Sequence, residues 1–522
     1  MLVAVLCWLL PGSRLRAQER PSLSRSWSEA TVGSELERYL RALQVAGVAP
    51  AGRAGWRGPD DRAVVSASAH PWGAKVAKEG AGPAVLRPGA NLTYSSGWPS
   101  GVNDGPVWAG RGATLSVSAG GAARWRGVML RVEPQWFVAQ NAGFDLDPVG
   151  ATFPVWRDPV SPGTIDAPQR MGDGAYMRAN AGQSTLAFAA RQFSVGVSSA
   201  NEGWGPSLTS PIILGANAPG IPRLFLSTGP AGVPLGIGRG HLRLIYGRIS
   251  PSGFGPQGDT SRFTSGAVAS FAPRGLNGLE LGAIRMFQRW WPSGGLSTSD
   301  LLAPFEGFLK ERLANKDNPA LPGGTPDNQL ASVFVRLLLP RVGAEAYVEY
   351  GRDDHSWDAA QLFNEPDHIS ATTLGVRRAV LGADGRTMHV WRAEWINGRI
   401  THLQRLRGQA PFYEHGAIVD GHTNQAQILG TPAVRGGGLV TLARDSYSAR
   451  GRWSVSLRRE GRQNNAEGGV GRGALIAATS EWVRFVGGSD LFMKTEMQAI
   501  VSPDGSADRR QFVVQLGARY GW

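Results

Sequence analysis

Asp353, Asp354 and His355 are the group of neighbouring side chains in this sequence that most resembles a catalytic site. A carboxylate and an imidazole can take a proton from water, which is the general-base chemistry of a hydrolase. Adjacent side chains of an extended chain point to alternate sides, however, so these three do not converge by themselves. A solvated loop is the commoner interpretation, and we predict no catalytic residue.

His415, Asp420 and His422 raise the question of a metal site. Their spacing matches no strong zinc pattern, and the single cysteine, Cys7, lies far away near the start of the chain. A polar loop or a polar lumen explains these residues without a metal. We therefore predict neither a metal nor a cofactor.

Glu202, Trp204, Asn217 and Arg223 have the chemistry of a carbohydrate contact. The face of a tryptophan stacks on a pyranose ring, while carboxylate, amide and guanidinium groups hydrogen-bond to sugar hydroxyls. The alternative is a structural turn, in which neighbouring glycines and prolines shape one end of a barrel. Both interpretations remain open at the level of sequence.

The net charge of +13 is carried almost wholly by arginine. The planar guanidinium fork suits carboxylate and phosphate groups. This charge fits contact with anionic lipid, including lipopolysaccharide, or with acidic polysaccharide. It would also fit nucleic acid, but the chain has no nucleic-acid motif and no dense basic run, so we predict no nucleic-acid partner.

The N-terminus resembles an export signal. A short apolar run from Leu2 to Leu10 is followed by Leu15, Arg16 and Ala17, which could end at a small-residue cleavage site. The run is too short to span a membrane as a helix. We predict that residues 1–17 are a cleaved signal peptide.

Residues 18–85 are predicted to form a helical plug segment. Leu36, Leu40 and Leu43 recur at helical spacing. Ser34 and Glu37 match a capping box. We therefore expect one amphipathic helix from Ser34 to Val45, ended by Gly47.

Residues 86–522 show the period of two that is typical of strands, most clearly at the C-terminus. One face of that segment carries Phe512, Val514, Leu516, Ala518, Tyr520 and Trp522. Apolar residues facing out and polar or small residues facing in are the pattern of a lipid-facing barrel strand. The aromatic end of Phe512 to Trp522 resembles the signal that the barrel-assembly machinery reads, which makes that machinery a predicted partner.

Other segments repeat this alternation. Glu345, Tyr347 and Glu349 share one strand face, which needs water and would find it in a lumen. Trp290, Trp291 and Trp395 fit an interfacial belt. At about 10 residues per strand with turns and loops, the chain suffices for roughly 16 to 18 strands.

Several motifs resemble the capsule-assembly Wzi family of outer-membrane barrels. They are the segments Glu202-Gly203-Trp204-Gly205-Pro206 with Asn217-Ala218-Pro219, Asp327-Asn328-Gln329-Leu330 with Glu345 to Gly351, and Tyr413-Glu414-His415-Gly416 with Gly421-His422-Thr423-Asn424. The resemblance implies a large antiparallel outer-membrane β-barrel of about 18 strands with a small N-terminal helical plug. It also adds Tyr413 and His415 to the candidate polysaccharide contacts.

The resemblance further implies a lectin-like role, in which the barrel holds capsular or other exopolysaccharide at the surface of a bacterial outer membrane without catalysis. Two alternatives stay open. A diffusion porin for anionic solutes would conduct ions, and an outer-membrane hydrolase would use the region of Asp353 to His355. The position of the plug segment distinguishes the polysaccharide-holding barrel from the porin, because a plugged lumen does not allow free diffusion.

Overall fold

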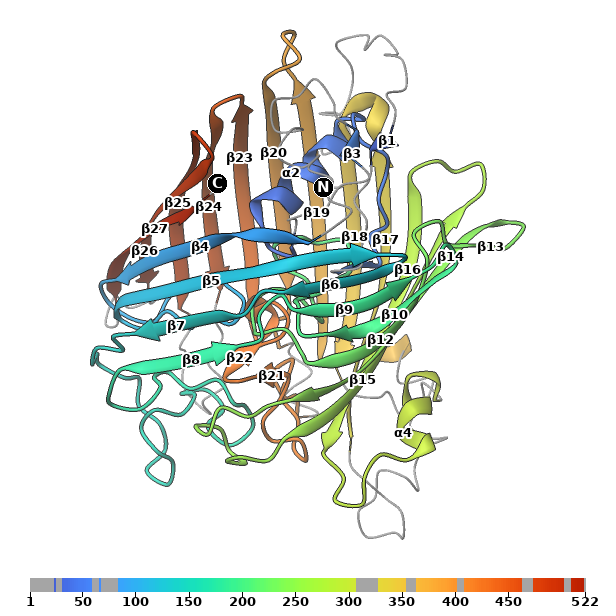
Figure 1. The fold of residues 1–522 in the computed structure, drawn as a ribbon. Coiled ribbons are helices and arrows are strands. Elements are labelled where there is room, and N and C mark those ends of the chain that lie inside the picture. Colours follow the sequence, from blue (N-terminus) through green and yellow to red (C-terminus); the bar gives the residue numbers. More distant parts are fainter. Residues whose placement is uncertain are drawn as a thin grey trace.

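The wall of the molecule is an antiparallel sheet closed on itself (Figure 1). The computed structural model describes residues 23–24, 31–58, 65–66, 83–306, 327–353, 363–400, 408–461, 473–501 and 508–520. Within these ranges 18 strands form a barrel, and β27 closes it by pairing with β4. The predicted fold class is therefore confirmed. The expected signal peptide lies outside the described residues.

Three of the 18 wall strands are each divided into two short strands. These pairs are β6 with β7, β8 with β9 and β12 with β13. The wall strands are β4 Ala84–Ser95, β5 Gly112–Trp125, β6 Val128–Val132, β7 Gln135–Ala139, β8 Tyr176–Asn180, β9 Thr185–Ala189, β10 Phe193–Ser198, β12 Arg223–Thr228, β13 Val233–Pro234, β14 Gly238–Ile249, β15 Arg262–Pro273, β16 Leu279–Trp290, β17 Asn328–Leu339, β18 Ala344–Asp353, β19 Ser370–Leu381, β20 Met388–Asn397, β23 Gly438–Ser448, β24 Gly451–Gly461, β25 Ala474–Val486, β26 Ser489–Val501 and β27 Arg509–Arg519.

The remaining elements are short. They are β1 Leu23–Ser24, α2 Glu35–Val45, β2 Trp56–Arg57, β3 Val65–Ser66, β11 Gly203–Trp204, α4 Thr298–Leu302, η2 Ala303–Phe305, η4 Pro340–Val342, β21 Thr423–Asn424, β22 Gln427–Ile428 and η6 Pro432–Val434. Among the described residues, no helix has the length and apolar character to cross a bilayer.

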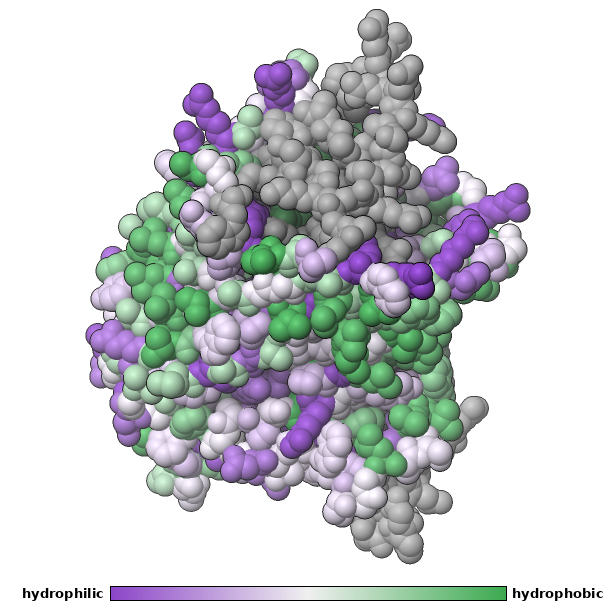
Figure 2. Space-filling model, viewed as in Figure 1, coloured by the Kyte–Doolittle hydropathy of each residue, from purple (hydrophilic) through white to green (hydrophobic). Residues whose placement is uncertain are grey.

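Alternation along the strands sorts side chains between the outside and the lumen. On β20, Trp391 and Trp395 are exposed on the outer face, whereas Val390 and Glu394 are buried inside. Figure 2 shows hydrophobic side chains gathered in a band over β6, β9, β10 and β12. This apolar outer surface is what a strand-built membrane wall requires, because lipid cannot hydrogen-bond to polar groups.

The C-terminal strand follows the predicted pattern. Phe512, Leu516 and Tyr520 are exposed on the outer face of the wall, and Gln511 and Val513 are buried. β27 covers Arg509–Arg519 and pairs with both β26 and β4. Trp522 lies outside the described residues.

The predicted belt tryptophans divide into two groups. Trp291 and Trp395 are exposed at the outer face, as an interfacial belt requires. Trp290 is half-buried, and its indole Nε1 donates a hydrogen bond to the carbonyl oxygen of Ala417 at 3.0 Å. The interpretation of Trp290 as a belt residue is therefore wrong, because its ring is tied to an interior loop.

The two ends of the barrel differ in their connections. Short turns, such as residues 449–450 between β23 and β24, lie at the end that also holds Ala84 and Arg519. Long connections, such as residues 140–175, lie at the opposite end. We name these the turn end and the loop end. In outer-membrane barrels short turns face the periplasm and long loops face outward.

The plug helix forms where the sequence predicts it. Ser34 caps α2 by accepting a hydrogen bond from the Glu37 amide at 3.3 Å, and the Glu37 carboxylate accepts one from the Gly33 amide at 2.7 Å. Gly47, with φ of +73°, ends the helix in the left-handed conformation that glycine adopts readily. Figure 1 shows α2 inside the cylinder, near β19 and β20.

The apolar face of α2 packs on the inner wall at the turn end. Leu36, Leu40 and Leu43 form one buried cluster with Leu338 on β17 and Met388 on β20. Burial of such a side chain contributes about 1.5–3 kcal/mol. Packing of this face against the wall therefore stabilises a helix that would be too short to persist alone.

The expected water-lined face of β18 is not observed. Glu345, Tyr347 and Glu349 do point into the lumen, but all three are buried. The carboxylate of Glu345 pairs with arginines from the plug and the wall instead of with water. That part of the prediction is wrong, because protein fills the lumen at this level.

Candidate functional site

Chain segments from both ends fill the lumen. Residues 31–58 occupy the turn end, and three long connections fold inward from the loop end: residues 96–111, 199–222 and 411–437.

Backbone hydrogen bonds join these inward segments to one another. The amide of Gly205 donates to the carbonyl of Gly55 at 3.0 Å, and that of Gly105 donates to Ala216 at 2.7 Å. β2 of the plug pairs with β11 of the 199–222 segment. Because buried amides need partners, this pairing lets irregular chain lie in the interior of the barrel.

Glu202, Trp204 and Arg223, three of the predicted sugar contacts, do come together. Glu202 accepts hydrogen bonds from Arg223 Nε and Arg243 Nε, both at 2.9 Å, and from Trp204 Nε1 at 3.0 Å. Trp204 is 0% exposed, so neither face of its indole is open to a ligand in this structure. The two guanidinium groups and the indole satisfy a carboxylate that could not otherwise remain charged inside a protein.

Asn217 and Tyr413 are also buried, and both hold interior loops together. Asn217 Nδ2 donates to the carbonyl of Ile428 at 2.9 Å. The Tyr413 hydroxyl donates to the carbonyl of Ile212. Tyr413 thus reaches the segment that carries Trp204, although the two come from distant parts of the sequence.

His415 lies apart from that cluster and is half-buried. Its Nδ1 accepts hydrogen bonds from the amides of Ala417 at 3.2 Å and Ile418 at 3.1 Å. It therefore shapes its own turn, and it does not join Glu202 and Trp204 in one site.

His422, the second histidine of the suggested metal group, is fully buried. Its Nε2 lies 2.6 Å from the carbonyl oxygen of Ile213, and its Nδ1 contacts the amide of Gln288. Burial lowers the pKa of His422 to about 4. Across the described part of the chain, no three His, Cys, Asp or Glu side chains gather as a metal-binding group.

Asp353, the first residue of the suggested catalytic triplet, ends β18 and is buried. Its carboxylate accepts a hydrogen bond from the Tyr413 amide. This hydrogen bond helps to hold the 411–437 segment in place. Asp354 and His355 lie outside the described residues.

A polar and aromatic cluster that the sequence did not predict lies at the loop end. Arg509 Nη2 is 2.9 Å from the Asp147 carboxylate, and its guanidinium carbon is 5.9 Å from the ring centroid of Trp98. The Trp98 amide donates to Gln511 Oε1 at 3.0 Å. We name Trp98, Asp147 and Arg509 the rim cluster.

The rim cluster is accessible and of mixed chemistry. The side chains of Arg509 and Asp147 are 36% and 48% exposed, and Trp98 is half-buried. No sequence motif joins these residues, since Asp147 and Arg509 are 362 positions apart. They meet only because β27 closes the barrel onto β4.

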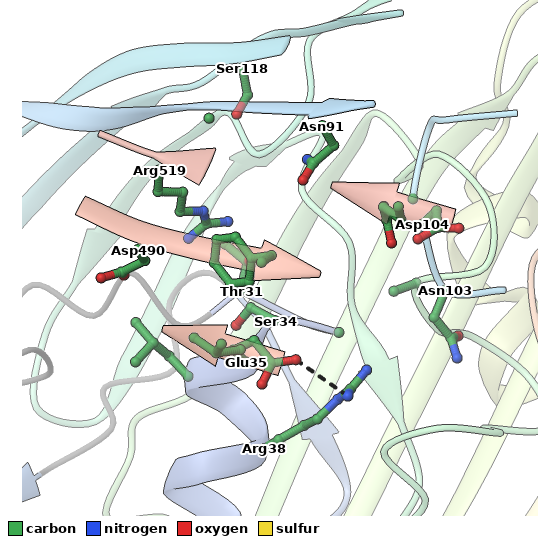
Figure 3. A pocket seen from close by; sticks show the side chains of 18 of the residues that line it. Thr31, Ser34, Glu35, Arg38, Asn91, Asn103, Asp104, Ser118, Asp490 and Arg519 are labelled. Atoms are coloured by element: carbon green, nitrogen blue, oxygen red, sulfur yellow. Dashed lines mark ion pairs between the residues drawn. The ribbon is translucent and has the colours of Figure 1, made fainter. Parts of the chain in front are cut away.

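A cavity of about 290 Å³ remains between the plug and the wall towards the turn end. Figure 3 shows Asn91, Ser118 and Arg519 of the wall near Ser34 and Glu35 at the start of α2. Glu35 is held by Arg38 in an ion pair of 3.3 Å. We name this space the polar chamber. Its hydroxyl, amide and charged groups suit water or a small polar solute.

Taken together, these features define an 18-stranded β-barrel of the outer-membrane type whose lumen is filled by a helix and inward loops. Its fold is similar to that of Wzi from Escherichia coli, described as an outer-membrane, carbohydrate-binding β-barrel involved in group 1 capsule assembly. The TM-score is 0.55 at 15% identity, over 84% of this chain and 85% of that chain. The expected resemblance is therefore confirmed for the fold.

Two other solved structures match more loosely. The protein opdK of Pseudomonas aeruginosa matches with a TM-score of 0.39 and 8% identity, over 84% of this chain and 99% of that one. OccAB2 of Acinetobacter baumannii matches with a TM-score of 0.42 and 8% identity, over 85% and 99%. No protein-family model and no curated protein sequence matches the chain.

Proposed function

We propose that this barrel binds and anchors acidic capsular or other exopolysaccharide at the outer surface of the bacterial outer membrane, without catalysis. The observation that carries the proposal is the filled lumen. Residues 31–58 and the inward loops occupy the interior. The surface that the barrel offers to a polymer is therefore its loop end and not an open pore. The likeness to a carbohydrate-binding barrel of the same architecture supports this assignment.

The rim cluster supplies groups that suit an acidic glycan. The indole face of Trp98 can stack on a sugar ring. The guanidinium of Arg509 can pair with a uronic-acid carboxylate, and the carboxylate of Asp147 can accept hydrogen bonds from hydroxyls. A chain with a net charge of +13 also attracts a polyanion at long range.

The six residues predicted from sequence have a different place in this proposal. Contact between polymer and Glu202, Trp204, Asn217, Arg223, Tyr413 or His415 stays a prediction. The burial of the first five, and their internal hydrogen bonds, support a positioning role in which they fix the inward loops. His415 is half-buried and fixes its own turn.

Export and assembly complete the proposal. Secretion through a cleaved signal peptide, and recognition of the C-terminal strand by the barrel-assembly machinery, both stay predictions. The exposed aromatic residues Phe512 of β27 and Tyr520, directly after the strand, support the second of them.

Binding to a defined polyanion tests the proposal. The whole barrel in detergent is titrated with alginate, with neutral dextran as the control polymer. We expect saturable alginate binding that weakens about tenfold or more in Trp98→Ala and Arg509→Gln, a loss of about 1.4 kcal/mol or more.

Trp395→Ala, which removes an exposed tryptophan from the lipid-facing wall, should bind as the parent does. Equal binding by all variants, or none by the parent, would contradict the proposal. The molar mass of the alginate should stay unchanged, as a non-hydrolytic binder requires.

A diffusion porin is the second candidate, and the polar chamber favours it. The chamber shows that α2 does not fill the full width of the lumen. A porin predicts steady ion conductance by the parent protein in a planar bilayer, whereas a closed anchor predicts none.

A further inference from the structure

An apolar groove of about 610 Å³ runs along the outer face of the wall. Its floor is a row of side chains that register places side by side across neighbouring strands. Leu130 pairs with Leu186, Leu186 with Val197, and Val197 with Leu224. All four are exposed on the outer face, Leu224 by 50%. This floor is therefore continuous with the hydrophobic band of the wall (Figure 2).

The side of the groove is a segment that folds back onto the outside of the barrel. Residues 291–306, which include α4 and η2, lie against β14, β15 and β16, and α4 stands outside the cylinder in Figure 1. The hydroxyl of Tyr246 on β14 donates to the carbonyl of Leu301 at 2.8 Å. Arg289 on β16 forms an ion pair with Asp300 of α4.

Asp300 also orders the start of α4, because its carboxylate accepts a hydrogen bond from the Ser297 amide at 2.7 Å. The segment is thus fixed to the wall at several points. Leu296 and Leu301 contribute to the lining of the groove. Leu302 and Phe305 of the same segment are also exposed.

A cationic side chain lies at the edge of the groove nearest the loop end. Arg248 follows Tyr246 on the same outer face of β14 and is exposed. Its guanidinium carbon lies 5.5 Å from the ring centroid of Trp291, and its Nη2 is 2.9 Å from Ser261 Oγ. Guanidinium and indole groups side by side at the end of an apolar surface are typical of the boundary between hydrocarbon and headgroups.

We propose that this groove is a lipid-binding site for an acylated, phosphorylated saccharide lipid of the outer leaflet, with one acyl chain along the groove and a phosphate at Arg248. A groove in a membrane-facing surface is filled by hydrocarbon, because contact between its apolar lining and water would cost free energy. The loop end faces outward, which places Arg248 at the outer leaflet. A guanidinium binds phosphate through charge-assisted hydrogen bonds. This inference is independent of polysaccharide binding.

Native mass spectrometry of the whole, delipidated barrel tests the site. Three lipids are added separately: bisphosphorylated lipid A, its dephosphorylated form and phosphatidylethanolamine. For the parent protein we expect one retained lipid A, with an affinity about tenfold above that of the other two lipids. Arg248→Gln should remove the preference for phosphate and leave binding of the dephosphorylated lipid unchanged.

Leu224→Trp should fill the groove and lower the retention of all three lipids. Leu442→Trp, at an equally outward position on β23, is the matched control and should retain lipid A as the parent does. Equal retention by the parent and Leu224→Trp would overturn the groove. Equal retention of lipid A and phosphatidylethanolamine by the parent would overturn the assignment of the lipid. Circular dichroism and the heat-dependent gel shift of the folded barrel confirm that each variant is folded.

Discussion

The guanidinium of Arg41 on α2 lies 2.6 Å from the carboxylate of Glu345 on β18, and both side chains are buried. Arg336 and Arg377 bind the same carboxylate at 2.6 Å and 2.9 Å. One wall carboxylate therefore ties the plug helix to three strands of the barrel. Since a buried ion is costly unless paired, this junction holds the plug at a specific place in the lumen.

Replacing Glu345 by glutamine should strongly destabilise the barrel. The change keeps the size of the side chain but leaves three buried guanidinium groups around a neutral amide. We expect the free energy of unfolding to fall by about 3–5 kcal/mol. Urea unfolding in detergent, followed by tryptophan fluorescence, measures it. Asp173→Asn is the control, because that side chain is 92% exposed and should change stability by less than about 0.5 kcal/mol. A similar small change for Glu345→Gln would refute the importance of the junction.

Reversing the charge at the plug should open the lumen. In Arg41→Glu, two carboxylates face each other where an ion pair stood, so α2 should leave the inner wall. We expect the parent protein to be closed in a planar bilayer and the variant to show ion conductance. Arg170→Glu, a change in a loop-end connection, should stay closed. A silent Arg41→Glu barrel would show that other contacts hold the helix, or that the inward loops close the lumen without it.

Trp204→Phe separates the structural interpretation of that residue from the sugar-binding one. The change removes the hydrogen bond from the indole to the buried Glu202 carboxylate. We expect a loss of stability of about 1–3 kcal/mol and alginate affinity within about twofold of the parent. The opposite result, unchanged stability with a large loss of affinity, would support direct contact between Trp204 and polymer.

The 411–437 segment should lose stability in mild acid through His422. Burial lowers the pKa of this imidazole to about 4, whereas its ordinary value is 6.5. Between these values the unfolded chain binds the proton and the folded chain does not. The contribution of neutral His422 to the free energy of unfolding is therefore complete above about pH 6.5. It is lost as the pH falls towards 4, by about 3 kcal/mol.

His422→Gln removes this titration and provides the comparison. We expect the difference in unfolding free energy between parent and variant to change between pH 6.5 and 4, and to be flat above pH 7. A difference that does not vary with pH would mean that His422 is already protonated in the folded barrel, or is accessible to solvent.

The parts of the fold that follow local patterns were predictable from sequence. The alternation that places Phe512 and Leu516 on one face identifies the outer face of β27, because strand side chains repeat every two residues. Ser34 and Gly47 delimit α2 because caps are local interactions.

The site was harder to predict because its contacts are non-local. Nothing near Trp204 in the chain indicates that Arg243 would pair with Glu202, or that β2 of the plug would pair with β11. The same holds for Glu345. The alternation of polar residues around it indicates a lumen, but it does not indicate which residues fill that lumen. The rim cluster depends on closure of the barrel, which pairs β27 with β4.

Retention of polysaccharide on cells tests the central claim most directly. In the source bacterium, with the barrel deleted, the acidic polysaccharide bound to cells and that released into the medium are measured as uronic acid. We expect the polymer to move from cells to medium with the total unchanged. Parent protein should restore retention, and a barrel with both Trp98→Ala and Arg509→Gln should not. An unchanged bound fraction after deletion, or full retention by the rim variant, would contradict the account.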